Sequence, residues 1–183
     1  DGSALPGHPE IVFSSPEVRE LAQQIQPFIE KNTERIQRRA DEYVATATES
    51  IERQVPLRVA GLSPRDGERV VLAEADPQGS EVGTRVRRVL YSALKGALSD
   101  DGPAPPALRT IAGDITSNGT VAEAAFVDAE IVAGSDIPVV AAKGDHDTAV
   151  TVQQLIDAGA EVPDTETVEV AGLRVASARD PEF

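Results

Sequence analysis

The chain has 183 residues, of which 31 are acidic and 17 are basic, so its formal net charge at pH 7 is −14. This charge argues against binding to nucleic acid or to an anionic membrane through bulk electrostatics. The chain contains no cysteine, which excludes disulfides, thiol catalysis and Cys-ligated zinc.

Hydrophobic residues make up 40% of the chain, but aromatic residues make up only 3%. We therefore expect a core of Val, Ile, Leu and Ala in one domain of ordinary size with an appendage. The chain begins Asp1-Gly2-Ser3 and contains no methionine, so we expect it to be part of a longer reading frame. No apolar run approaches the roughly 18 residues that cross a bilayer.

Residues 1–15 are rich in Gly, Pro and Ser and predict a flexible tail. Residues 16–56 predict a long helical segment, because Ser15 followed by Pro16 is a typical helix start. Pro27 is expected to kink or divide this helix, and Pro56 is expected to end it.

An apolar stripe follows this helix in steps of three and four residues. Its members are Val18, Leu21, Ile25, Phe28, Ile36, Ala40, Tyr43 or Val44, Ala47, Ile51 and Val55. The stripe is narrow, which suits a stalk or a coiled-coil-like docking surface. Packing on the protein's own domain is the alternative to a partner chain or self-association.

Residues 57–67 predict a linker, and residues 68–183 alternate between strand and helix patterns. The predicted strands cover 68–75, 107–112 and 137–142, and the predicted helices cover 82–98, 120–132 and 148–158. Such alternation predicts an α/β fold with a mainly parallel sheet and right-handed crossovers. Period-two alternation over 167–178 predicts a terminal antiparallel hairpin.

Each predicted strand ends in an acidic loop. These loops are Ala75 to Gln78, Gly113-Asp114, and Gly144 to Asp147. Ligands of open α/β sheets bind at the carboxyl ends of the strands, and carboxylates that converge there suggest divalent cations. We expect three aspartates, one from each loop, to lie within about 8 Å of one another, and their mutual repulsion to raise at least one carboxyl pKa.

The order Asp-x-x, Gly-Asp, Gly-x-His-Asp on successive strands resembles the calcineurin-like metallophosphoesterase superfamily, in the style of its actinobacterial, membrane-anchored members. The resemblance covers residues 70–180 and the N-terminal half of the family domain. It implies metallophosphoesterase-like βαβ units, one sheet of a two-sheet sandwich and a hydrolase fold. We expect the long helix or another chain to cover the apolar face that half a sandwich leaves bare.

The resemblance also implies metal ligands. Asp114 would be the carboxylate that bridges two metals, Asp76 would bind one metal, and Asp145 would bind the other. Gln78 stands where the family has a histidine ligand, and Asp145 stands where the family has asparagine. The later histidines of the family motif are absent from residues 1–183. The chain as given therefore cannot build the family's dinuclear site, since transition-metal pairs depend on imidazole ligands.

By the same resemblance, two residues would be catalytic. His146 would meet the substrate phosphate and protonate the leaving group, and Asp147 would hold the imidazole in the correct tautomer. These residues also fit a purely structural interpretation. Gly113-Asp114 is a common turn sequence, and Asp147 is a suitable helix cap.

Two functions follow from these patterns. The first is a degenerate or incomplete metallophosphoesterase-like domain, inactive as this chain, that serves as a binding or scaffolding module of the cell envelope. The alternative is a fragment of an active metal-dependent phosphoesterase whose remaining ligands lie beyond residue 183. For the chain as given we expect at most one weakly bound divalent cation (Mn²⁺, Mg²⁺ or Ca²⁺).

The expected partner is another protein chain or a second copy, bound through the 16–56 helix. No nucleic acid is expected, and membrane contact is expected only through segments absent from this chain. The expected location is the extracytoplasmic side of the membrane.

Overall fold

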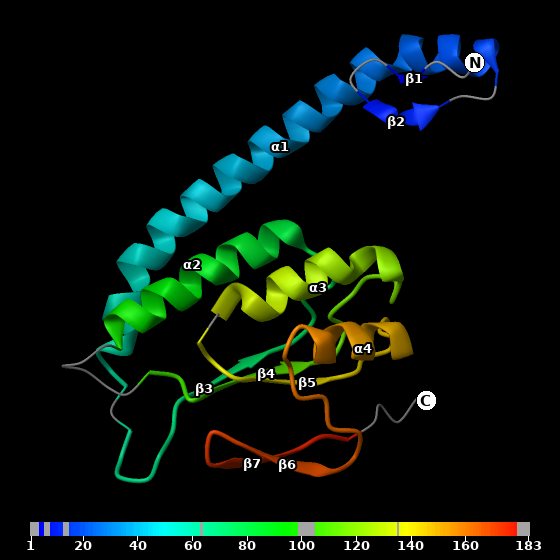
Figure 1. Ribbon diagram of the computed structural model, residues 1–183. Coiled ribbons are helices and arrows are strands. Elements are labelled where there is room, and N and C mark those ends of the chain that lie inside the picture. Colours follow the sequence, from blue (N-terminus) through cyan, green and yellow to red (C-terminus); the bar gives the residue numbers. More distant parts are fainter. Residues whose placement is uncertain are drawn as a thin grey trace. The chain divides into compact units, whose positions relative to one another are not determined.

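The structure is a computed structural model that describes residues 4–5, 8–12, 15–62, 64–98, 105–134 and 136–178. The chain divides into two compact units, residues 1–45 and 46–183, and each is described by itself. The protein is mixed α/β, with a long N-terminal helix, a small parallel sheet and an antiparallel hairpin (Figure 1).

The first unit contains a two-stranded ribbon and the first part of the long helix. Strands β1 (Ala4–Leu5) and β2 (His8–Val12) pair antiparallel, where the sequence predicted a flexible tail. The sequence places Pro6-Gly7, a typical turn dipeptide, between two short segments that each contain an apolar pair. The rest of the predicted tail before Ser15 lies outside the described residues.

Helix α1 (Pro16–Val59) starts as the sequence predicted. The Ser15 hydroxyl accepts a hydrogen bond from the Val18 amide at 3.2 Å, and proline occupies the first helical position, where its missing N–H costs nothing. The helix crosses from the first unit into the second.

The expected division of α1 at Pro27 and its expected end at Pro56 are both wrong. The helix continues through Pro27 and extends past Pro56 to Val59, so the linker begins three residues later than predicted. Pro56 lies in the last turn, and its carbonyl still accepts a hydrogen bond from the Ala60 amide at 3.1 Å. A proline in a helix removes one backbone donor, and the rest of this long helix keeps its own hydrogen bonds.

The second unit is built on a three-stranded parallel sheet with the order β3-β4-β5. Its strands are β3 (Val71–Glu74), β4 (Leu108–Ala112) and β5 (Val139–Ala142). Its helices are α2 (Glu81–Ala97), α3 (Ala124–Ile131) between the short turns η1 (Val121–Glu123) and η2 (Val132–Gly134), and α4 (Ala149–Asp157). The final hairpin pairs β6 (Thr167–Val170) with β7 (Leu173–Ala176). The predicted parallel sheet and hairpin are confirmed, with bounds shifted by a few residues.

Helices α2, α3 and α4 lie on one face of the sheet, and the hairpin lies on the other side (Figure 1). The strands follow one another in a single direction, so right-handed crossovers bring successive helices to the same face. The main core fills the space between sheet and helices. It comprises Ile111, Ile115, Phe126, Val127, Ile131, Val139, Ala141, Leu155 and Ala160.

The last turns of α1 pack on the outside of α2. Ile51, Val55 and Val59 contact a set of apolar α2 residues that ends at Leu98. This segment therefore does not cover the face of the sheet opposite the helices, where the sequence led us to expect the long helix or another chain. Val71 remains 40% exposed.

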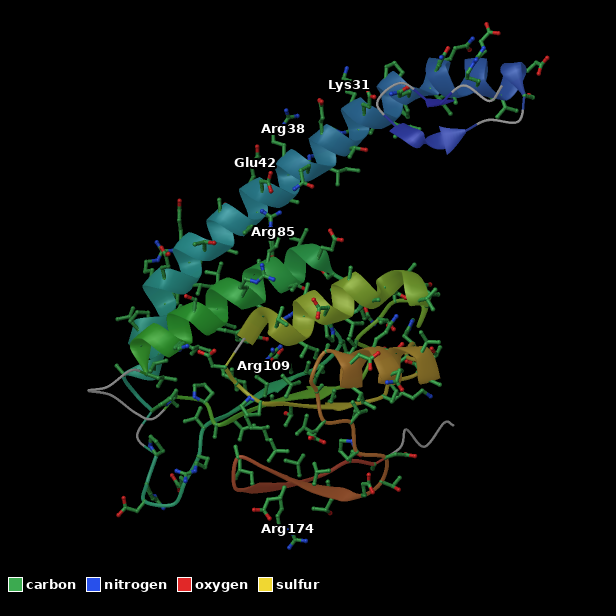
Figure 2. The ribbon with its side chains drawn as sticks, viewed as in Figure 1. Lys31, Arg38, Glu42, Arg85, Arg109 and Arg174 are labelled. Atoms are coloured by element: carbon green, nitrogen blue, oxygen red, sulfur yellow. The ribbon has the colours of Figure 1, made fainter. Side chains whose placement is uncertain are left out.

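The core also contains charged residues that composition did not predict. Arg109 of β4 and Glu130 of α3 are both fully buried (Figure 2). The Arg109 guanidinium donates to Glu74 Oε1 at 3.0 Å and to the Tyr91 hydroxyl at 2.9 Å. Arg87 donates to both oxygens of Glu130 at 2.7 Å. Two guanidinium groups thus balance two carboxylates, and burial followed by the hydrogen bond to Glu74 raises the pKa of Tyr91 far above its usual range.

Candidate metal centre

The loops after β3 and β4 are joined by backbone hydrogen bonds. Asp76 N donates to Gly113 O at 3.2 Å, Gln78 N donates to Asp114 O at 2.9 Å, and Gly79 N donates to a third carbonyl of the same segment at 3.0 Å. The two loops therefore leave the sheet side by side, at the carboxyl ends of parallel strands, where ligands of such sheets bind.

Three of the residues singled out from the sequence have left-handed backbones. The φ angles are 53° at Asp76, 45° at Gln78 and 49° at Asp114. L-residues other than glycine rarely adopt this region, and such conformations concentrate at functional sites. In the part of the chain that the structure describes, the other left-handed non-glycine residues are Thr165 and Ala171, which belong to the segment around the final hairpin.

Two glycines let the loops after β4 and β5 touch. A Cβ on Gly144 would lie 2.1 Å from Asp114 Oδ1 and 2.3 Å from the Asp114 amide nitrogen, which no side chain tolerates. A Cβ on Gly113 would lie 3.0 Å from the Cα of Gly144. The glycine of each Gly-Asp pair is therefore what allows Asp114 to approach the third loop.

Asp147 fastens the same two loops together. Its buried carboxylate accepts hydrogen bonds from the backbone amides of Ile115 and Thr116, from the Thr116 hydroxyl and from the Gly144 amide, at 2.8 to 3.1 Å. The family resemblance implied that Asp147 orients the His146 imidazole. In the structure its oxygens are engaged with the loop backbones instead, so its role is to hold the site's framework.

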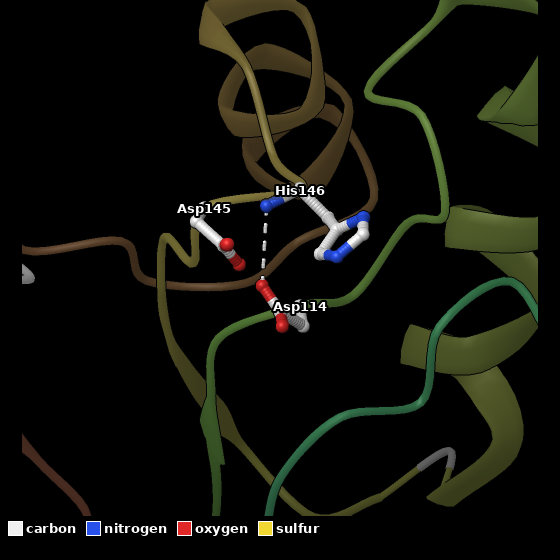
Figure 3. Close-up of side chains that lie close together, drawn as sticks. All are labelled: Asp114, Asp145 and His146. Atoms are coloured by element: carbon white, nitrogen blue, oxygen red, sulfur yellow. Dashed lines mark hydrogen bonds between the residues drawn. The ribbon is translucent and has the colours of Figure 1, made fainter.

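His146 is tied to the loop after β4 by two contacts. Its backbone amide donates to Asp114 Oδ1 at 3.2 Å, the bond drawn in Figure 3. Its ring Nδ1 lies 2.9 Å from the Ser117 carbonyl oxygen. A carbonyl can only accept, so Nδ1 carries the proton and Nε2 is left to meet a ligand. The Ser117 carbonyl, and not Asp147, therefore orients the His146 imidazole.

Asp114, Asp145 and His146 form the group best suited to hold a cation among the described residues (Figure 3). Each offers one ligand atom, and these atoms all lie within 4.8 Å of one another. Two carboxylate oxygens and one imidazole nitrogen can coordinate a single divalent cation, with water completing the shell. The donor set thus fits one cation.

The structure does not bring all the predicted ligands together. Asp76 lies outside the group of three, although its backbone borders the loop of Asp114. The Gln78 side chain helps to lower the pKa of the Asp114 carboxylate. The residue at the position where the resemblance implies a histidine ligand therefore stabilises the ionised form of Asp114.

The expected rise of a carboxyl pKa does not occur at Asp114. Partial burial acts in that direction, but the hydrogen bond from the His146 amide, together with the nearby imidazole and the Gln78 side chain, keeps the Asp114 pKa below its ordinary value. Repulsion between aspartates is outweighed here by donors that the sequence analysis did not place.

The pKa of His146 is raised above its ordinary value. The hydrogen bond to the Ser117 carbonyl contributes most, followed by the Asp145 charge, and Asp114 adds to them. The imidazole is therefore protonated over a wider pH range than a free histidine. A proton on Nε2 and a cation compete for this atom, so cation affinity through His146 increases with pH.

Sequence reasoning did not find the residues that support the site. Glu123 accepts hydrogen bonds from the Ser117 amide at 2.7 Å and from the Thr120 amide at 3.1 Å, which fixes the turn whose carbonyl meets His146. The capping-box pattern of Thr120 and Glu123 was the available signal, and the box is present. By itself this pattern predicts only a helix start.

No protein-family model, curated protein or solved structure matches this chain. Among the described residues, no helix is both long enough and apolar enough to cross a membrane.

Proposed function

We propose that the region after the long helix is a degenerate metallophosphoesterase-like domain that binds one divalent cation and does not hydrolyse phosphate esters. The observation that carries this proposal is the convergence of Asp114, Asp145 and His146 within 4.8 Å. The order of the three loops on successive parallel strands supports the family assignment.

The cation would be held by oxygen ligands with at most one imidazole. Mn²⁺, Mg²⁺ and Ca²⁺ all accept such a set, and two exposed or half-buried carboxylates without an enclosing shell bind weakly. A cation there would neutralise the two aspartates and polarise a bound water or phosphate oxygen. The chain's own residues orient the site: Gly113 and Gly144 allow the approach, and Asp147 locks the loops.

The same residues argue against turnover. A pair of metals needs a second set of ligands beside the bridging carboxylate. Besides the group of three, the chain offers Asp76, which lies outside that group, and Gln78, which helps to lower the Asp114 pKa. A neutral amide is a poor metal ligand, so Gln78 does not replace the imidazole that the resemblance implies at this position.

The alternative, part of an active phosphoesterase, is favoured by one feature of His146. Its Nε2 is directed away from the bond to Ser117, and its raised pKa keeps a proton available for a leaving group. That proton is what the family reaction requires, and residues outside this chain would have to supply the missing ligands.

We also propose that the domain acts as a binding or scaffolding module of the cell envelope, on the extracytoplasmic side, and that α1 provides the contact with a partner chain. The location rests on the resemblance of the motifs. The partner surface rests on the exposed apolar stripe of α1.

A hydrolysis assay separates the two functions. With bis-(p-nitrophenyl) phosphate or p-nitrophenyl phosphate and millimolar Mn²⁺, we expect no turnover above that of His146→Ala. Metal-dependent turnover that is lost in both His146→Ala and Asp114→Asn would establish the alternative. Gln78→Glu is a useful companion, because it introduces a charged oxygen ligand at this position while leaving His146 unchanged.

A further inference from the structure

The first half of α1 exposes an apolar stripe on one face. Val18 is 51% exposed, Leu21 58%, Ile25 47% and Phe28 71%. Contiguous exposed apolar surface of this kind marks an interaction site in a soluble protein. All four residues belong to the first unit, 1–45.

The residue types along the stripe follow a heptad pattern. With Val18 at position a, Leu21 and Phe28 fall at d, and Ile25 falls at the next a. β-Branched residues at a with leucine at d favour two parallel strands. Pro27 then falls at the outward position c, where it does not obstruct a partner helix.

Asn32 falls at the third a position. A single asparagine at a is the residue that fixes the register and the two-stranded state of a parallel coiled coil, because it pairs with its own copy across the seam. In an antiparallel pair the amide would instead face an apolar side chain. The side chain already donates to the Phe28 carbonyl at 2.8 Å and accepts from Arg35 at 2.8 Å, which leaves its second N–H for the partner.

The pattern ends after Asn32. The next d and a positions are Arg35 and Arg39, and in a parallel pair each would lie beside its own copy. Like charges at the seam oppose pairing, so the helices separate there. The apolar stripe moves to position e, at Ile36 and Tyr43.

We propose that residues 18–32 of α1 form a parallel, in-register, two-stranded coiled coil with a second copy of this chain. The proposal is independent of the cation site. Asn32 pairs best with its own copy, so the partner helix is a second copy of this chain. Arg35 and Arg39 limit the seam to two heptads, so the dimer is weak and depends on concentration.

Residues 1–183 contain no cysteine, which permits a direct test on this chain. Ile25→Cys places a thiol at the seam, whereas Gln23→Cys places one on the exposed outer face, at position f. In a parallel dimer the two thiols at position 25 come within disulfide reach, so under mild oxidation we expect Ile25→Cys to form linked dimers roughly tenfold faster or more than Gln23→Cys.

Sedimentation equilibrium on the unmodified chain should give a mass that increases with concentration from 19.3 kDa towards about twice that value. Ile25→Glu should remain monomeric, and the matched Gln23→Glu should still associate. A strictly monomeric chain, equal linking rates for the two cysteine variants, or equal association of the two glutamate variants would each overturn the proposal.

Discussion

Two charged clusters on the same small sheet differ in burial and in charge balance. Around Arg109, two guanidinium groups face two carboxylates, and Arg109 and Glu130 are fully buried. Around Asp114, two carboxylates face one imidazole and remain partly or largely open to solvent. A buried, neutral network belongs to the fold, because an uncompensated charge there would destabilise it. An open cluster with an excess of negative charge is available to a cation.

Removing the central cation of the buried cluster should have the largest effect. In Arg109→Met, Glu74 loses the guanidinium that pairs with it, and Glu130 keeps only Arg87 as a charged partner. Breaking one side of a buried pair typically costs about 3–5 kcal/mol, so urea denaturation should show a loss of that order. A loss below about 1 kcal/mol would contradict the structural role given to the network. Arg174→Met, on the exposed hairpin, is the control.

Disrupting the contact between the two loops of the open cluster should have the second largest effect on stability. In Gly144→Ala the new Cβ would overlap the Asp114 amide nitrogen at 2.3 Å, so the loops must separate. Overpacking of this kind costs about 1–3 kcal/mol, and cation binding should be lost with it. Gly96→Ala is matched in chemistry but meets nothing within 4 Å in α2, so it should stabilise the protein slightly. Equal effects of the two substitutions would refute the close-approach account.

The smallest effect concerns the turn that positions His146. Hydrogen bonds from the Thr120 and Ser117 amides lower the Glu123 pKa although partial burial opposes them. A lowered folded-state pKa stabilises the protein above the unfolded value and is lost as pH falls through the folded one. Glu123→Gln should therefore lower the melting temperature slightly at pH 7, and the difference should shrink as the pH falls and Glu123 becomes protonated in the folded protein. A difference in melting temperature that stays constant as the pH falls would contradict this account.

The sequence was sufficient for the sheet, its helices and the hairpin, because each has a clear hydrophobic period. It was also sufficient to place the three loops at one edge, since parallel strands share their carboxyl ends. It failed for Arg109, because one arginine in an apolar strand is usually taken as facing solvent. Its partners come from β3, α2 and α3, and no local pattern reports such a meeting.

The hydrogen bonds of the site could not be predicted from the sequence for a related reason. Whether Asp147 faces an imidazole or a backbone amide depends on how two distant loops approach, which Gly113 and Gly144 decide through the contacts they permit. The lowered Asp114 pKa likewise depends on donors from two other loops. Residue types indicated which side chains would gather, but the hydrogen bonds among them are a property of the assembled loops.

The most direct test of the central claim is the stoichiometry of Mn²⁺ binding, measured by calorimetry at pH 7.5 on the wild-type chain, Asp114→Asn and Asp76→Asn. We predict one Mn²⁺ per chain, an affinity loss of about tenfold or more in Asp114→Asn, and near wild-type binding in Asp76→Asn. Two Mn²⁺ per chain, or equal losses in the two variants, would contradict the account and show that the site holds a metal pair.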